Sequence, residues 1–205
     1  PELQRKLRNK LKQCKEQQKP ASIIYKEIRK SHEYKLLLKA VRQYFRTIYG
    51  IFQIDIDSRE KILNRIIKKP SVEAHVAMLN THRSTKERSS YYKEIYKTIF
   101  QKTKKPLSIL DLGAGLNVFS YPFLDCKPRY YAYELNEKDS ILVTRYMKAM
   151  NIPGKIKTID LADSDSVLNE QFPKTDVCFM FKLVNTLETI KRHSSKTLIS
   201  AIKSR

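Results

Sequence analysis

Four short apolar runs divide the second half of the chain, and no other feature constrains the fold as strongly. Polar stretches separate the runs, and one of them, residues 137–150, has the length of a helix. Strands that alternate with helices are typical of a parallel sheet, because a crossover connection must return the chain to the same edge. We therefore predict an α/β second half with strands near residues 107–112, 130–133, 155–159 and 176–181.

The first half has a different pattern, in which apolar residues recur three and four positions apart. This spacing predicts short amphipathic helices. Ser58 and Ser71 precede two of these helices as candidate N-caps, and Ser84 to Glu87 has the S-x-x-E spacing of a capping box that would start a third. We expect a helical bundle with a basic outer surface. The apolar positions that define it include Leu3, Leu7, Leu11, Cys14, Ile62, Ile66, Val72, Val76 and Leu79.

The charge is concentrated in the first half. The chain has 41 Lys and Arg residues against 21 Asp and Glu, a formal net charge of +20. Before Pro106 the balance is 27 against 10, or +17, and from Pro106 onward it is 14 against 11, or +3. Such a field attracts nucleic acids through counterion release, although Lys-rich faces can also serve only to solvate helices. We predict a basic helical RNA-docking domain over residues 1–105 and a second domain over residues 106–205.

Composition argues against several other classes of protein. The longest apolar run covers only the five residues Val177 to Phe181, whereas a membrane span needs roughly 18. Cys14, Cys126 and Cys178 lie far apart, with no C-x-x-C pair and no neighbouring His, so the spacing indicates neither a disulfide framework nor a zinc site. We expect a reducing, cytoplasmic setting with no membrane partner and no metal.

A glycine-containing loop follows the first predicted strand. Asp111, Gly113, Gly115 and Asn117 lie in the segment D-L-G-A-G-L-N, at the strand end where open α/β sheets bind ligands. We expect this loop to open a helix. A dinucleotide fingerprint would have its third glycine where this chain has Val118, so a dehydrogenase is disfavoured.

Acidic residues follow the next two predicted strands. Glu134 could accept hydrogen bonds from both ribose hydroxyls of an adenosine, and Asp160 could accept from an adenine amino group. Together they favour an S-adenosylmethionine site, although Glu134 alone could be a surface carboxylate and Asp160 could only cap a turn. Arg88 could grip the carboxylate of the methionine moiety, or it could pair with Glu87 or Glu94.

Three segments resemble the aminoglycoside-resistance methyltransferases of 16S ribosomal RNA. They are residues 82–88 (H-R-S-T-K-E-R), 109–117 (I-L-D-L-G-A-G-L-N) and 181–188 (F-K-L-V-N-T-L-E), and the likeness runs from about Tyr34 to Glu188. This resemblance implies a Rossmann-like, class I S-adenosylmethionine methyltransferase core behind an N-terminal helical domain that docks the small ribosomal subunit. It also implies transfer of a methyl group to N7 of a guanine in the decoding site.

The same resemblance assigns roles to individual residues. Arg88 would hold the carboxylate of the cofactor, Glu134 its ribose and Asp160 its adenine. Gly113 and Gly115 would line the methionine and ribose, and Lys182 would face the pocket for methyl transfer. The predicted site therefore comprises Lys182 as the catalytic residue and Arg88, Asp111, Gly113, Gly115, Asn117, Glu134 and Asp160 as cofactor-binding residues.

The chain also departs from the family pattern. Val118 and Asn185 replace prolines of two family motifs, and the family continues beyond the equivalent of Arg205 with further strands, which this chain is expected to lack. These departures keep two alternatives open: a noncatalytic RNA-binding or ribosome-assembly protein on a methyltransferase fold, and a methyltransferase that acts on transfer RNA.

Overall fold

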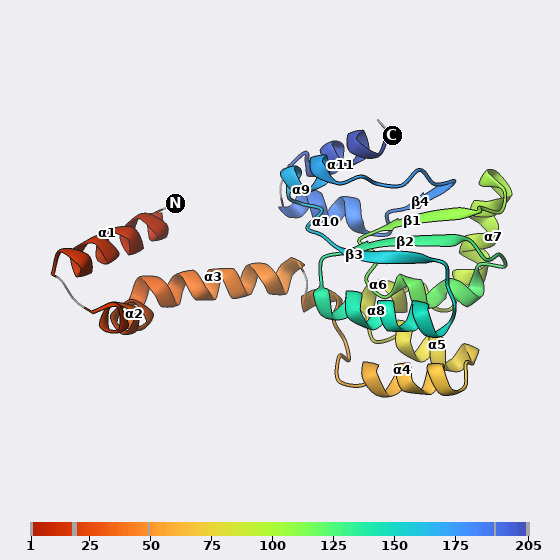
Figure 1. The fold of residues 1–205 in the computed structure, drawn as a ribbon, viewed down its shortest axis with the longest axis horizontal. Helices are drawn as coiled ribbons and strands as arrows, with labels where there is room; N and C mark the ends of the chain where they lie inside the picture. Colours follow the sequence, from red (N-terminus) through yellow and green to blue (C-terminus); the bar gives the residue numbers. More distant parts are fainter. Residues whose placement is uncertain (1, 18–19, 49, 191, 204–205) are drawn as a thin grey trace. The chain divides into compact units, whose positions relative to one another are not determined.

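The structure is a computed structural model that describes residues 2–17, 20–48, 50–190 and 192–203 (Figure 1). The chain divides into two compact units, residues 1–51 and 52–205. This division lies earlier than the boundary at Pro106 that the charge distribution suggests. Among the described residues, no helix combines the length and the apolar character that crossing a lipid bilayer requires.

The described part of the first unit contains the helices α1 (Glu2–Glu16), α2 (Ala21–Lys30) and α3 (His32–Ile48). The three helices pack on one another, and Cys14 of α1 is buried with its Sγ atom 3.6 Å from Oε2 of Glu27. Ser31 separates α2 from α3. Its hydroxyl donates to the carbonyl of Ile28 at 2.7 Å and accepts from the amide of Tyr34 at 3.2 Å, so one side chain ends one helix and starts the next.

The second unit is built around a four-stranded parallel sheet with the strand order β3-β2-β1-β4. Each of the four predicted strands is confirmed within two residues at either end. The strands are β1 (Ser108–Leu112), β2 (Arg129–Glu134), β3 (Gly154–Thr158) and β4 (Val177–Phe179).

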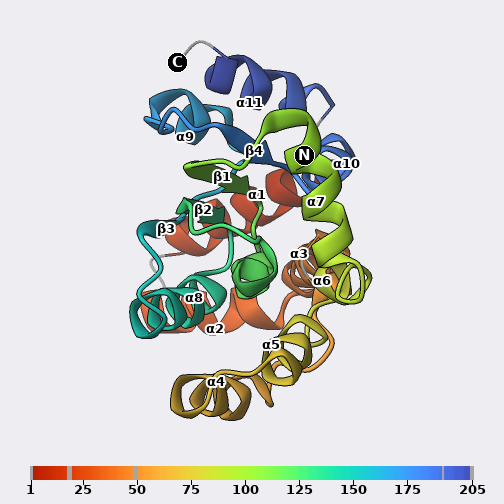
Figure 2. The same cartoon turned by 90° about the vertical axis from the view of Figure 1, so that its right-hand side faces the viewer.

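Helices cover both faces of this sheet, so its central strand β1 is almost completely buried (Figure 2). On one face lie α4 (Arg59–Lys68), α5 (Val72–Leu79), α6 (Arg83–Lys86), α7 (Tyr92–Thr103), the 3-10 helix η2 (Asn117–Phe123) and α8 (Glu137–Ala149). On the other lie α9 (Ser164–Asn169), α10 (Leu183–Ile190) and α11 (Ser194–Lys203). A further 3-10 turn, η1 (Gly50–Phe52), precedes α4.

The predicted helix starts at Ser58 and Ser71 are confirmed in position, but only one serine caps through its side chain. Ser71 is extended and its hydroxyl accepts from the amide of Ala74 at 3.2 Å. Ser58 has helical backbone angles and makes no side-chain cap bond, because its backbone already follows the helical path.

Two expectations from the sequence are wrong. Ser84 does not start a long helix as part of a capping box: it lies inside the four-residue α6, and α7 begins only at Tyr92. The second wrong expectation is the bundle: helices α4, α5 and α7 do not continue one, since their buried apolar residues join the core of the sheet. The loop after β1 does open a helix, as expected, and this helix is the 3-10 helix η2, which contains Pro122.

Candidate functional site

The carboxyl ends of three strands meet at one edge of the sheet. Leu112 at the end of β1 pairs in register with Tyr133 of β2, and Glu134 at the end of β2 pairs with Thr158 of β3. Because β2 and β4 flank β1 on opposite sides, this edge lies at the point where the strand order reverses. Open α/β sheets bind ligands at such a point.

The loop after β1 needs both of its glycines. Gly113 and Gly115 have φ angles of +65° and +51°, in the left-handed region that side chains disfavour. A Cβ atom on Gly113 would lie 2.9 Å from Cδ1 of Leu183, and one on Gly115 would lie 3.2 Å from the ring of His82. The loop therefore turns tightly, and the side chains of Leu183 in α10 and of His82 before α6 pack closely against it.

Glu134 is the predicted residue that this loop contacts directly. Its Oε2 atom accepts the amide hydrogen of Gly115 at 2.7 Å, and its Oε1 atom accepts that of Asn136 at 3.0 Å. The carboxyl group is buried, and this burial raises its pKa to about 7, although the backbone donors favour the charged form. Glu134 is therefore a buried carboxylate held at the sheet edge and not a surface carboxylate.

Asp111 and Asn117 lie together in a polar network below the loop. Oδ2 of Asp111 accepts from Nδ2 of Asn117 at 2.9 Å and from the hydroxyl of Tyr130 at 2.6 Å. Oδ1 of Asn117 accepts from the hydroxyl of Tyr92 at 2.7 Å. Burial raises the pKa of Asp111 to about 6, against the effect of these donors. The network fixes the start of η2.

Arg88 is half-buried against two aromatic rings. Its guanidinium carbon lies 4.5 Å from the ring centroid of Phe181 and 5.7 Å from that of Tyr92, and one of its nitrogens donates to Oγ of Ser84 at 3.0 Å. Its Nε atom is buried and has no hydrogen-bond partner among the described residues. A cationic group with a donor to spare suits an anionic ligand.

Lys182 lies three residues beyond the end of β4, and its φ angle is +61°. Its Nζ atom pairs with Oε2 of Glu87, the neighbour of Arg88 in sequence, and both side chains of the pair are nearly half exposed. This pair lowers the pKa of Glu87. The structure thus brings together the two segments that carry Lys182 and Arg88. Glu87, which the sequence offered as a partner for Arg88, pairs instead with Lys182.

Asp160 differs from Asp111 and Glu134 in that it is not buried. It is exposed, two residues beyond the end of β3, and its Oδ1 atom accepts from the amide of Ala162 at 2.8 Å. The turn-capping alternative therefore describes the contact that the side chain makes. A second carboxylate oxygen and the exposed position leave it able to accept from a ligand.

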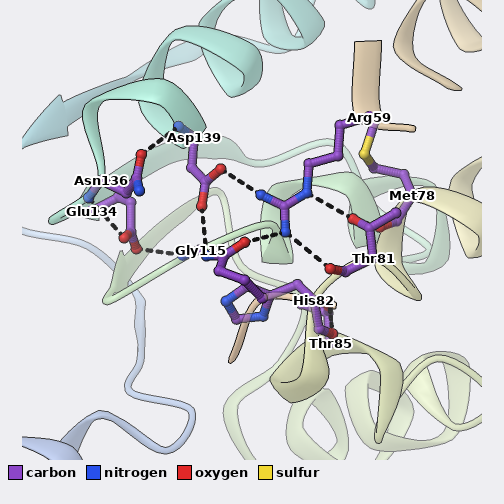
Figure 3. A network of polar contacts seen from close by, with 10 residues as sticks. Arg59, Met78, Thr81, His82, Thr85, Gly115, Glu134, Asn136 and Asp139 are labelled. Carbon is purple, nitrogen blue, oxygen red and sulfur yellow. Dashed lines mark hydrogen bonds and ion pairs between the residues drawn. The ribbon is translucent and has the colours of Figure 1, made fainter. Parts of the chain in front are cut away.

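A buried ion pair beside the site was not predicted from the sequence. Nη1 of Arg59 in α4 lies 2.7 Å from Oδ1 of Asp139 in the first turn of α8, and both side chains are at most 5% exposed. The other guanidinium donors contact Thr81 and Gln53 (Figure 3). Arg59 and Asp139 stand 80 residues apart and belong to none of the motifs, so no spacing in the sequence relates them.

His82 connects this ion pair with the glycine loop. Its ring covers Gly115 and stacks on Phe52 at a centroid distance of 5.7 Å and an interplanar angle of 10°. Burial lowers the pKa of His82 to about 4, and the positive charges of Arg59 and Arg88 add to this effect. The imidazole is therefore neutral near pH 7 and acts as a flat packing group above the loop.

A match to a known family accounts for this arrangement. The family model described as "Ribosomal RNA methyltransferase (FmrO)" matches residues 68–205. The chain belongs to this family. The resemblance seen in the three sequence segments is thereby confirmed.

Two relatives of this chain are both named as methyltransferases of 16S ribosomal RNA. A "16S rRNA (guanine(1405)-N(7))-methyltransferase" of Proteus mirabilis is 28% identical over 187 residues, which are 82% of this chain and 65% of the relative. A protein of the same name from Micromonospora echinospora is 27% identical over 128 residues, 62% of this chain and 45% of the relative. The chain thus spans less than two thirds of the length of either relative.

Solved structures of similar fold include the 16S rRNA methyltransferase RmtF in complex with S-adenosyl-L-homocysteine. It has a TM-score of 0.69 and 23% identity, and the match covers 83% of this chain and 64% of RmtF. The 16S rRNA methylase RmtB has a TM-score of 0.67 and 18% identity, with 95% and 70% covered. The fold of this ribosomal RNA methyltransferase family member is therefore the predicted class I methyltransferase core with an N-terminal helical region.

The residues at the sheet edge suit S-adenosylmethionine. Glu134 accepts two backbone hydrogen bonds, and an ionised carboxylate has about four acceptor positions, so two remain for ribose hydroxyls. Arg88 has a buried Nε donor that no described residue satisfies, which suits the carboxylate of the methionine moiety. The cationic sulfonium would lie in a region where Asp111 and Glu134 supply negative charge.

Proposed function

We propose that this chain forms the cofactor-binding part of an enzyme that methylates N7 of a guanine in 16S-type ribosomal RNA, with S-adenosylmethionine as the methyl donor. The observation that carries the proposal is the Glu134 carboxylate, buried at the sheet edge and held by the amide of Gly115, in a member of a ribosomal RNA methyltransferase family. The names of the relatives supply the base, the atom and the RNA.

The proposed binding roles follow the chemistry of the side chains. Glu134 accepts from the ribose hydroxyls, Arg88 binds the carboxylate, and Asp160 accepts from the adenine amino group with its free oxygen. Gly113 and Gly115 bring the backbone close to the ligand. Asp111 and Asn117 act from below, because their network fixes the start of η2 and thereby the loop.

The proposed reaction needs little acid or base chemistry from the protein. The methyl donor supplies an electrophilic methyl group on a sulfonium. N7 of guanine has an in-plane lone pair and no proton, so its attack requires no general base, and alignment with exclusion of water is the main task. Lys182 is proposed to border the base pocket, where its exposed pair with Glu87 lies between the segment after β4 and the segment of Arg88.

The proposed partner is an assembled small ribosomal subunit, methylated in its decoding site in the cytoplasm. The +17 charge before Pro106 supports phosphate contacts that position the RNA without reading its sequence. Turning a stacked base out costs a few kcal/mol, which such contacts help to offset. The similarity to resistance methyltransferases adds the proposal that the modification protects ribosomes from aminoglycosides.

Titration calorimetry with S-adenosylhomocysteine tests cofactor binding. Wild type binds, and Glu134→Gln weakens binding about tenfold or more, because a charged acceptor of two hydrogen bonds is lost. The matched control is Glu137→Gln, three residues further on and exposed, which leaves the affinity unchanged. Absence of binding by wild type would favour the noncatalytic RNA-binding alternative.

A methyl-transfer assay tests the substrate. Small ribosomal subunits, naked 16S ribosomal RNA and transfer RNA are each incubated with methyl-labelled cofactor, and the modified nucleotide is mapped. The proposal expects label at a guanine N7 of the subunit. Label only on transfer RNA would replace the ribosomal substrate with the alternative one.

A further inference from the structure

Contacts around Glu134 form a closed circuit through the buried ion pair. The ion pair joins Arg59 to Asp139, whose amide donates to Oδ1 of Asn136 at 3.1 Å. The amide of Asn136 donates in turn to one oxygen of Glu134, and the amide of Gly115 donates to the other. Figure 3 shows these residues side by side.

The second half of the circuit returns from Gly115 to Arg59. The ring of His82 covers Gly115, and His82 follows Thr81 in the chain. Arg59 donates to Oγ1 of Thr81 from Nε and to its carbonyl oxygen from Nη2, both at 3.0 Å. One guanidinium therefore holds both flanks of the hydrogen bond between Gly115 and Glu134.

Helix packing alone does not require this buried pair. Arg145 of α8 and Glu60 of α4 join the same two helices through an exposed ion pair of 2.8 Å. The buried pair differs because it ends at the turn that presents Glu134. An exposed pair contributes little, whereas a buried pair with every contact satisfied can fix one geometry.

We propose that Arg59 and Asp139 are positioning residues for the ribose-binding carboxylate Glu134. The pair fixes the turn from Glu134 to Asn136 on one side and the His82–Gly115 contact on the other, so that the free acceptor positions of Glu134 point in one direction. This inference rests on the proposed function, because it requires that Glu134 bind the ribose of the cofactor.

The test compares two ligands by titration calorimetry. The first is S-adenosylhomocysteine, and the second is its analogue without the two ribose hydroxyls. Arg59→Lys and Asp139→Asn each weaken binding of the first ligand about tenfold, the size typical of residues that couple in one network, and change binding of the second less than about twofold. Arg145→Gln, the matched control, leaves both affinities within about twofold of wild type.

A double-mutant cycle places the effect on Glu134. In a Glu134→Gln background, Arg59→Lys causes no further loss, because the group that it positions has already been changed. If Arg59→Lys and Asp139→Asn fail to give a cooperative thermal transition, Asn136→Ala breaks the circuit at the turn. Asn136→Ala then shows the same selective loss, and Asn136→Ser restores binding because serine also accepts from the amide of residue 139.

Equal losses for the two ligands would overturn the inference, since general loosening does not distinguish ribose hydroxyls. Unchanged affinity in all three variants would overturn it as well. Failure of wild type to bind S-adenosylhomocysteine would overturn the proposed function itself, and is distinguishable because it precedes any comparison of variants.

Discussion

His82 and Glu134 are buried next to the same glycine, Gly115, and burial shifts their pKa values in opposite directions. Burial lowers the pKa of His82 from 6.5 to about 4 and raises that of Glu134 from 4.5 to about 7. The stability that neutral His82 contributes is complete above pH 6.5 and is lost as the pH falls toward 4. Protonated Glu134 stabilises the fold at low pH, and that contribution is lost as the pH rises through 7.

A His82→Gln variant separates these effects. Between pH 7.5 and pH 5 the unfolded chain takes up a proton at residue 82 and the folded protein does not, so wild type loses about 2 kcal/mol that the variant retains. Urea denaturation at the two pH values measures this difference, and the Glu134 effect cancels because both proteins contain Glu134. His32→Gln, at an exposed position, serves as the control. Identical pH dependence in wild type and His82→Gln would contradict a neutral buried imidazole.

The proposed role of Glu134 predicts that cofactor affinity depends on the charge of this residue. Hydroxyl groups donate to the ionised carboxylate, so binding is strongest above pH 7 and weakens as Glu134 takes up a proton. With a pKa of about 7, the affinity for S-adenosylhomocysteine falls about tenfold from pH 8 to pH 6. Calorimetry on Glu134→Gln checks the assignment, because this variant binds weakly with no such dependence. A wild-type affinity that stays constant over the range would be inconsistent with a titrating Glu134.

The residues in the sequence motifs could be predicted from the sequence, whereas the residues that contact and position them could not. Glu134 and the glycine loop could be placed because strand ends meet at a predictable edge. The pair of Arg59 and Asp139 depends on how α4 packs against α8, and no periodicity encodes that contact. For Asp160 the position was predictable, because it lies within two residues of the end of β3. Its contact is with the amide of Ala162 in the turn that follows the strand.

At the level of elements, the two serines at the starts of α4 and α5 differ in a testable way. Ser71→Ala removes the acceptor of the Ala74 amide at the start of α5 and costs about 1 kcal/mol of unfolding free energy. Ser58→Ala costs less, because Ser58 makes no side-chain cap bond in α4. Chemical denaturation of both variants measures the difference. Equal losses would mean that the cap of α5 is not formed.

The pairing of β2 with β3 depends more strictly on a glycine than the loop after β1 does. Gly154 has a φ of +129°, and a Cβ atom there would lie 1.9 Å from the carbonyl oxygen of Tyr130, which rigid backbone holds in place. Gly154→Ala therefore costs about 3 kcal/mol or more. Gly113→Ala meets only the end of the Leu183 side chain and costs about 1–2 kcal/mol, mostly from its positive φ. Thermal melts that rank the two variants in the reverse order would contradict this assignment.

Sequence periodicity located the strands better than the helix ends. Apolar runs bounded by polar residues mark β1, β2 and β4, which are mostly buried, since a buried parallel strand has no polar face. The edge strand β3 is mostly exposed and contains two lysines. The start of α7 was misplaced because Ser84 and Glu87 have the spacing of a capping box but make other contacts. Ser84 accepts from Arg88, and Glu87 pairs with Lys182, a residue 95 positions away. Tertiary partners therefore outcompete the local capping pattern.

On the scale of the whole molecule, charge and packing divide the chain at different places. Residues 1–51 have 14 basic and 4 acidic residues, and residues 52–205 have 27 and 17, so each compact unit has a net charge of +10. The first unit has that charge on about a quarter of the chain. The predicted docking domain over residues 1–105 thus combines the first unit with helices α4–α7, which belong to the second unit.

The charge distribution predicts that RNA binding and cofactor binding can be separated. Deletion of residues 1–51 removes a net charge of +10 but none of the residues proposed to bind cofactor, so affinity for S-adenosylhomocysteine stays within about twofold of wild type. RNA affinity at low salt falls about tenfold or more, and the dependence of log Kd on log salt becomes shallower because fewer counterions are released. Filter binding to 16S ribosomal RNA at several salt concentrations measures both quantities. An unchanged salt slope after deletion would place the phosphate contacts on the second unit, and the docking function would then belong to the basic helices that pack on the sheet.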